Sequence, residues 1–316
     1  MSSQIAIFTQ IFTVTGPVFA MLVIGMVLKR SRLIDDHFIS VASVLSYKAL
    51  MPTLLFFGIL RADLNTALQP KLIGYFYLAT VLSFGWAWLW ARRTVPAENR
   101  GLYVQGAFRG NCGIVGLALA ASQYGDYGIS VGGVMAGLII VLFNVLSVIV
   151  LGVYSTSFKA DVRSVIKDLA RNPLILSVLA GLLASSAGVT LPEWIMVSAD
   201  YFSSMTLPLA LVCVGGTLSL SAFIDSGRIA LSSSLFKVLW TPALFTLGAV
   251  LLGFEGRDLG MLYLFLASPT AAVSYVMARA SGSDGKLAAN IIAISTAISV
   301  ITIMAGLYIL RSFAFI

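Results

Sequence analysis

Long apolar runs dominate the chain, and the charged residues gather in the short segments between them. A helix needs about 20 mostly apolar residues to cross a lipid bilayer. The pattern therefore predicts an all-α integral membrane protein with ten spans. These spans are placed at residues 8–28, 37–60, 71–91, 100–124, 127–154, 172–188, 194–220, 230–252, 258–280 and 287–310.

The composition is typical of a membrane protein and gives no indication of a nucleic-acid partner. Of the 316 residues, 59% are hydrophobic and 10% are charged, whereas soluble domains are about 25% charged. The net charge of +7 does not indicate a nucleic-acid partner, because the sequence has no basic run with interleaved aromatic residues. The opening segment, MSSQIAIFTQ, lacks the basic region of a secretory signal, so the first span is expected to be retained.

The residue types present point away from metal ions, cofactors and catalysis. Both cysteines, Cys112 and Cys213, lie inside predicted spans, where packing is a commoner role than metal binding. The sequence has no glycine-rich loop ending in Lys-Ser or Lys-Thr that would bind a nucleotide. With a single histidine, the chain has few groups for acid–base work, and we expect neither a cofactor nor an enzyme.

Basic residues set the expected orientation. Most lysines and arginines lie in the loops that follow the odd-numbered spans, and basic loops face the cytoplasm. Both termini are therefore expected outside the cytoplasm, in a multi-pass protein of the cell (inner) membrane. The lipid bilayer is the first expected partner.

The two halves of the chain resemble each other. The segment GPVFAMLVIG at 16–25 matches NPLILSVLAG at 172–181, with proline and glycine in the same places. The two segments are 156 residues apart, and the same offset relates Pro52 to Pro208. Because each half contains five spans, an odd number, the second half must enter the membrane from the opposite side. The sequence thus predicts an inverted repeat, which is common among secondary transporters.

This repeat divides the chain into a first five-helix unit at 1–154, a cytoplasmic connecting loop at 155–171 and a second, inverted unit at 172–316. Chance similarity between apolar helices is the alternative. The match favours a repeat because it rests on prolines and glycines more than on leucines.

The middle of the fourth span contains residues that disfavour a continuous helix. They are Arg109, Gly110, Asn111, Cys112 and Gly113. Glycine in a helix interior costs about 1 kcal/mol relative to alanine, and asparagine prefers helix caps. The sequence therefore predicts a broken helix, with Asn111 capping its second half.

The ninth span contains a second predicted break, at Ser268, Pro269 and Thr270. Proline removes a backbone donor and clashes with the preceding turn, so it ends the first half-helix. It also suits the first position of a new helix, for which Ser268 would be the N-cap. A simple kink in a packed helix is the alternative interpretation of Pro269.

The two breaks are expected to cross near the membrane midplane and to form a substrate site. Non-helical backbone is tolerated there only where it is buried in protein or lines a watery cavity. Two helix N-termini aimed at one point favour an anion such as a carboxylate. Arg109 would either contact this anion or satisfy carbonyls of the first half-helix. Asn144 is expected to line the cavity or to join helices.

Other residues inside the spans are assigned around this site. Pro52 and Pro208 are included among the substrate-binding residues because the repeat relates them. Lys48 and Asp200 are a candidate gating or coupling pair, with a structural ion pair or an interfacial position as the alternative. Lys237 is expected to extend to the membrane interface.

Four segments of the chain form motifs with a characteristic order and spacing. They are GNCGIVGLALAASQYGD at 110–126, NPLILSVLAGLL at 172–183, LPLALVCVGGTLS at 207–219 and SPTAAVSYVMA at 268–278. In these motifs the chain resembles bacterial members of the auxin efflux carrier family, whose plant members export auxin, and the resemblance covers almost the whole chain.

The resemblance implies ten helices in two inverted repeats, a crossover of the fourth and ninth helices at the substrate site, and a homodimer. It also implies an elevator-like motion of helices 3–5 and 8–10 against helices 1, 2, 6 and 7. Family substrates are small organic anions. Gly110 replaces a proline of the plant carriers, and the plant residues that recognise the indole ring do not transfer, so auxin itself is not implied.

The sequence as a whole favours a secondary transporter of a small organic anion, a mono- or dicarboxylate. A sodium or proton antiporter or symporter of the same architecture is the first alternative. Cation binding usually needs carboxylates, and the segments 107–118 and 265–279 contain none. A membrane sensor that binds a ligand without moving it is the second alternative.

Overall fold

The computed structural model describes residues 2–61, 68–155, 167, 170–218 and 227–316. Within these residues the regular structure is helical, apart from one isolated bridge between Gly110 and Thr270. The predicted connecting loop at 155–171 lies for the most part outside the described residues.

The elements follow one another in a simple order. In the first half they are α1 Ser2–Arg30, α2 Asp36–Leu45, η1 Ser46–Leu50, α3 Met51–Arg61, α5 Pro70–Thr94, η2 Ala97–Asn99, α6 Arg100–Phe108, η3 Cys112–Gly116 and α7 Leu117–Tyr154. In the second half they are α9 Pro173–Ser186, α10 Glu193–Ser204, α11 Thr206–Thr217, α13 Arg228–Leu235, η4 Phe236–Trp240, α14 Thr241–Leu251, α15 Gly256–Ala267, α16 Val273–Ala280 and α17 Gly285–Ser312.

Seven helical segments of the described chain are long and apolar enough to cross a membrane. Three predicted spans are not among them as separate segments. The sixth, α9, has 14 residues, and the fourth and ninth are interrupted. The second part of the fourth span continues into the fifth as α7, across a kink at Gly125 whose φ of 55° suits glycine.

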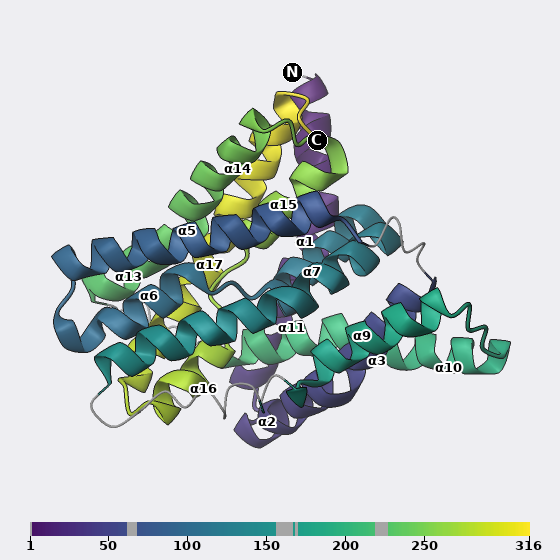
Figure 1. Ribbon diagram of the computed structural model, residues 1–316, viewed down its shortest axis with the longest axis horizontal. Helices are drawn as coiled ribbons and strands as arrows, with labels where there is room; N and C mark the ends of the chain where they lie inside the picture. Colours follow the sequence, from purple (N-terminus) through teal and green to yellow (C-terminus); the bar gives the residue numbers. More distant parts are fainter. Residues whose placement is uncertain (1, 62–67, 156–166, 168–169, 219–226) are drawn as a thin grey trace.

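The helices form two packed groups. In the first group, α1 packs on α11, and α3 packs on α9 and α10. In the second group, α5 packs on α6, α13 on α17 and α14 on α15. Figure 1 shows α3, α9 and α10 together at the lower right, whereas α5, α6 and α13 lie at the left. Contacts of α7 with α3 and of α1 with α17 join the two groups.

Close helix contacts in the first group depend on glycine. A Cβ on Gly215 of α11 would collide with the Leu22 carbonyl of α1, and a Cβ on Gly25 of α1 would collide with the backbone of α11. A Cβ on Gly181 of α9 would lie 3.1 Å from the Phe56 carbonyl oxygen of α3. Small residues of this kind let helix backbones in a membrane approach closely.

Prolines alter the helical turns that precede them. The π-helices η1 and η4 each end two residues before a proline, Pro52 and Pro242. Proline cannot donate the hydrogen bond to the residue four positions earlier, so the turn before it widens or breaks. The seventh predicted span breaks at Met205, three residues before Pro208.

We expect Gly215→Ala to lower the free energy of unfolding by about 1–3 kcal/mol, because the new methyl group overpacks the contact between α1 and α11. Gly85→Ala in α5 is the matched control, since a Cβ there would meet no atom within 4 Å. Thermal melting of the detergent-purified variants checks this. Equal melting temperatures for both variants would show that this contact is dispensable.

Candidate functional site

The first break separates α6 from η3. The helix α6 ends at Phe108, and Arg109 is extended, with φ −83° and ψ 101°. Asn111 is also non-helical, with φ −82° and ψ 55°, and η3 begins at Cys112. The interruption predicted within 109–113 is therefore confirmed.

The second break separates α15 from α16. The helix α15 ends at Ala267, Ser268 has φ −57° and ψ 138°, and α16 begins at Val273. The break is confirmed, but its predicted capping is wrong. Pro269 does not open the new helix, and the Ser268 hydroxyl donates backwards to the Phe265 carbonyl, 2.8 Å away. Serine often makes this local bond at a helix end.

The two breaks cross and bind each other through their backbones. The Asn111 N–H donates to the Pro269 carbonyl at 2.6 Å, and the Ala271 N–H donates to the Arg109 carbonyl at 3.0 Å. Gly110 and Thr270 face each other between these bonds as an antiparallel bridge. The pairing satisfies backbone groups that would otherwise be unpaired away from water. We call the segments 109–111 and 268–272 the crossing.

Side chains from neighbouring helices fix the crossing in place. The Thr270 hydroxyl donates to the Gly106 carbonyl of α6 at 2.8 Å, and the Thr270 N–H donates to the Ser295 hydroxyl of α17 at 3.1 Å. A Cβ on Gly110 would lie 2.7 Å from the Ser268 hydroxyl oxygen. Glycine therefore meets a packing requirement at 110, because any larger residue would push the two segments apart.

Asn111 presents an unused amide to the crossing. Its carbonyl accepts the N–H groups of Val115 and Gly116, so its backbone begins η3. Its side chain, 7% exposed, makes no capping hydrogen bond and no hydrogen bond to another described residue, and its amide atoms are not among the fully enclosed unpaired atoms. The amide therefore reaches the small exposed part of this residue, where a water molecule or a ligand can complete its hydrogen bonds.

Arg109 is committed to α7. Its side chain is 4% exposed, and its two Nη atoms donate to the Ser147 hydroxyl at 3.0 Å and to the Asn144 amide oxygen at 2.7 Å. The guanidinium also lies over the Phe143 ring, 5.9 Å from its centroid. Of the two roles that the sequence leaves open, this geometry favours the structural one. Asn144 of α7 thereby connects α7 to the first break, which corresponds to the second of the two roles expected for it, joining helices.

Cys112 and Gly113 begin the second half of the first broken span. The Cys112 thiol lies 3.4 Å from the Ser268 hydroxyl oxygen and 3.5 Å from the Phe265 carbonyl oxygen. A Cβ on Gly113 would lie 3.5 Å from the Met51 methyl group, which precedes Pro52 in α3. Cys112 therefore packs between the two breaks, as a structural cysteine does.

Lys237, in η4, lies beside the crossing and is buried, so its predicted position at the membrane interface is wrong. It is 2% exposed, and its Nζ atom donates to the Leu266 carbonyl oxygen at 2.6 Å. Its Cε atom would lie 3.3 Å from a Cβ on Gly110. A lysine five residues before Pro242, inside an apolar span, was the signal that could have identified it.

The other assigned residues lie around the crossing or away from it. Pro52 is half-buried in α3, whereas Pro208 is exposed in α11, a helix that packs against η3. The proposed pair of Lys48 and Asp200 does not form. Asp200 instead binds Arg61 at the end of α3, with 2.7 Å between Nη2 and Oδ1, and Lys48 is exposed. Asp200 lies in the second half of α10, and α10 packs on α3, which ends at Arg61.

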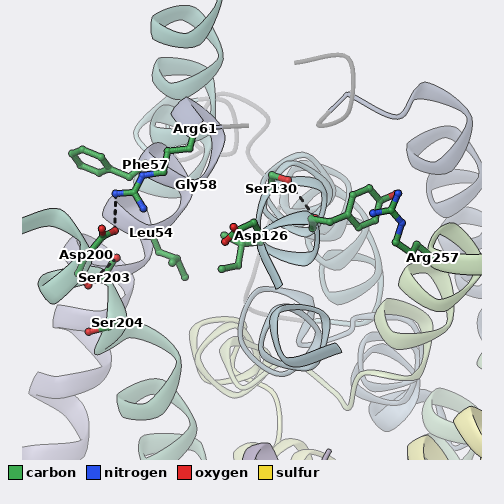
Figure 2. Close-up of a pocket in the computed structure, with 12 residues that line it drawn as sticks. Leu54, Phe57, Gly58, Arg61, Asp126, Ser130, Asp200, Ser203, Ser204 and Arg257 are labelled. Carbon is green, nitrogen blue, oxygen red and sulfur yellow. Dashed lines mark hydrogen bonds and ion pairs between the residues drawn. The ribbon is translucent and has the colours of Figure 1, made fainter. Parts of the chain in front are cut away.

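A cavity of about 560 Å³ lies between the two helix groups. Figure 2 shows the ion pair of Arg61 and Asp200 on one wall, with Ser130 and Arg257 towards the other and Asp126 between them. The crossing residues are not among those that line it. The lining residues are Leu54, Phe57, Gly58, Arg61, Asp126, Tyr127, Ile129, Ser130, Asp200, Ser203, Ser204 and Arg257.

Comparison with known sequences decides the family. A sequence profile of the family described as membrane transport protein matches residues 10–157 and 154–306, which together cover most of the chain. This chain belongs to that family. The match confirms the resemblance to the auxin efflux carriers.

Two archaeal relatives are also described as uncharacterized transporters. The relative from Methanothermobacter thermautotrophicus is 25% identical over 295 residues, which are 90% of this chain and 94% of that protein. The relative from Methanocaldococcus jannaschii is 27% identical over 212 residues, 65% of this chain and 67% of that protein. With its apolar helices, the chain is a multi-pass integral membrane transporter, a non-enzymatic role.

In this transporter we expect Arg109→Met and Asn111→Ala to differ in stability. Arg109→Met should lower the free energy of unfolding by about 1.5–3 kcal/mol for each hydrogen bond lost to Asn144 and Ser147. Asn111→Ala removes an amide without partners and should melt close to the wild type. Melting of both variants in the same detergent tests this; a larger loss for Asn111→Ala would contradict the assignment.

Proposed function

We propose that the protein is a secondary transporter of a small organic anion, a mono- or dicarboxylate, bound at the crossing. The observation that carries the proposal is the amide of Asn111, which lies beside the paired breaks in a largely buried residue and makes no hydrogen bond to the described residues. An amide N–H₂ donates readily to a carboxylate, and hydrogen bonds to charged groups are the stronger ones.

Backbone groups beside Asn111 favour the same ligand. The helical segments that begin at Cys112 and Val273 each carry a partial positive charge at their starts, as helix N-termini do. In transporters with discontinuous helices, such N-termini point at anionic substrate groups. Neither strand of the crossing carries a carboxylate, which a cation carrier would need.

The proposal includes ten spans in two inverted repeats. Gly25 in the first predicted span packs against the seventh span, and Gly181 in the sixth packs against the second. These two contacts exchange places when the halves are exchanged, as an inverted repeat requires. Each half also contributes one broken span to the crossing, the fourth and the ninth, and these two breaks pair with each other.

The division of the helices into two groups supports alternating access. The group that contains the crossing would move as an elevator against the group built from α1, α3, α9, α10 and α11, and the cavity between them would be one access route. The proposed setting is the cell inner membrane, with both termini outside the cytoplasm. The proposed assembly is a homodimer.

The substitution Asn111→Asp tests the site. A carboxylate at 111 would stand about 4 Å from a bound anion, and at an effective dielectric constant of 20 this repulsion is roughly 4 kcal/mol. We expect uptake of radiolabelled mono- and dicarboxylates into proteoliposomes to fall by at least tenfold. Asn111→Ala should lose uptake less severely, because it removes a donor without adding a charge.

Gly85→Ala is the control for reconstitution, since this position is far from any packed atom. Normal anion uptake by Asn111→Asp would contradict the proposed site. Cation uptake that increases in Asn111→Asp would favour the antiporter. Carboxylates that stabilise the wild-type protein but are never taken up would favour a sensor.

Relative motion of the two groups is tested by a disulfide. A Cβ on Gly58 of α3 would lie 2.8 Å from the Ile129 Cγ2 atom of α7, so Gly58→Cys and Ile129→Cys place two thiols within bonding reach. We expect oxidation of the double variant to stop uptake and a reductant to restore it. Each single variant, oxidised in parallel, is the control. Full uptake by the cross-linked protein would contradict motion between the groups.

A further inference from the structure

We propose that Lys237 is a resident cation of the crossing, so that the transporter moves its anion without co-transporting a metal cation. The proposal rests on the anion transport proposed above and specifies how the charge of that same site is balanced. It depends on the position of one ammonium group relative to the ends of the broken helices.

Lys237 is held at the C-terminal end of α15. Its Nζ atom donates to the carbonyl of Leu266, one residue before α15 ends at Ala267. The side chain reaches this carbonyl from η4, where the Thr241 N–H bonds to the Phe236 carbonyl in a π turn. At 2% exposure, the lysine is enclosed by protein.

The carbonyls at the ends of α6 and α15 need donors. The Gly106 carbonyl accepts the Thr270 hydroxyl, and the Phe265 carbonyl accepts the Ser268 hydroxyl. These donors are neutral, whereas the Leu266 carbonyl accepts a bond from a lysine. A helix C-terminus carries partial negative charge and is stabilised by a cation.

No side-chain carboxylate neutralises Lys237 in the described part of the chain. The ion pairs found there join Lys29 to Asp36 and Arg61 to Asp200. The crossing segments contain no acidic residue. The ammonium group is therefore bound by the neutral Leu266 carbonyl and leaves one positive charge for an anion in the crossing.

In transporters with discontinuous helices, unwound carbonyls and half-helix C-termini coordinate the coupling Na⁺ or H⁺, while half-helix N-termini hold the anion. Lys237 supplies a covalently attached positive charge at such a C-terminus. A metal ion at the same carbonyls would meet this ammonium at close range in a region of low dielectric constant and would be repelled. The Lys237 ammonium group thus takes the place of a coupling cation at this helix end.

The test compares cations in the transport assay. Wild-type protein is reconstituted into liposomes of phosphatidylethanolamine and phosphatidylglycerol, and carboxylate uptake is measured in sodium, potassium or choline chloride. We expect equal initial rates in the three salts. The variants are Lys237→Arg, which keeps the charge, and Lys237→Met, which removes it at similar length.

Lys237→Arg should keep uptake independent of the cation. Lys237→Met should lose at least tenfold in choline chloride and should regain uptake in sodium chloride, because an ion can then approach the Leu266 carbonyl. A lysine with a packing role alone would not change the dependence on the cation. The wild-type comparison needs no variant, so it tests whether transport depends on a metal cation even if Lys237→Met does not fold.

Two results would overturn the inference. One is a sodium requirement in the wild type, which leaves anion transport itself intact. The other is Lys237→Met uptake in choline chloride at the wild-type rate. Absence of any carboxylate uptake by the wild type in all three salts would overturn both this inference and the proposed function.

Discussion

The backbone pairing between the two breaks is the constraint on which the rest of the site depends. An unpaired backbone group in the hydrocarbon region costs several kcal/mol, so a helix can be interrupted there only if another segment completes it. The reciprocal bonds between Asn111 and Pro269 and between Ala271 and Arg109 do this for both segments at once. Each break therefore requires the other, and glycine at 110 is needed because the Ser268 hydroxyl lies in the space of a side chain.

Side chains connect the paired backbones of the two breaks to the surrounding helices. Arg109 connects the first break to α7, Thr270 connects the second break to α6, and both are buried. Lys237 serves the end of α15. Each of these side chains binds another part of the protein, although the Arg109 Nε atom has no partner in the described part of the chain. The Asn111 side chain makes no hydrogen bond to the described residues. The proposed site therefore combines side chains that are fixed by hydrogen bonds with one amide that is free to bind a ligand.

The sequence predicted both breaks because glycine, asparagine and proline in an apolar span have few other uses. It also predicted their meeting, since non-helical backbone at membrane depth must be covered. It did not predict which way side chains turn. Lys237 was assigned to the interface because a lysine near a span end can extend there, but a π turn before Pro242 directs it inward. Asp200 was paired with Lys48 by depth alone, whereas the packing of α3 on α10 brings Arg61 to it.

The same geometry explains why the cavity and the crossing are separate. The crossing is fixed inside one helix group by bonds to α6, α7 and α17, so its shape cannot open without breaking them. The cavity lies between that group and the group of α3 and α10, and an ion pair and three small serine side chains are among the residues that line it. In the proposed mechanism, access to the crossing comes from sliding one group past the other, because loosening the crossing would unpair the two breaks. The proposed mechanism therefore uses both features: the rigid pairing holds the crossing together, and the cavity lies at the boundary where the two groups would slide.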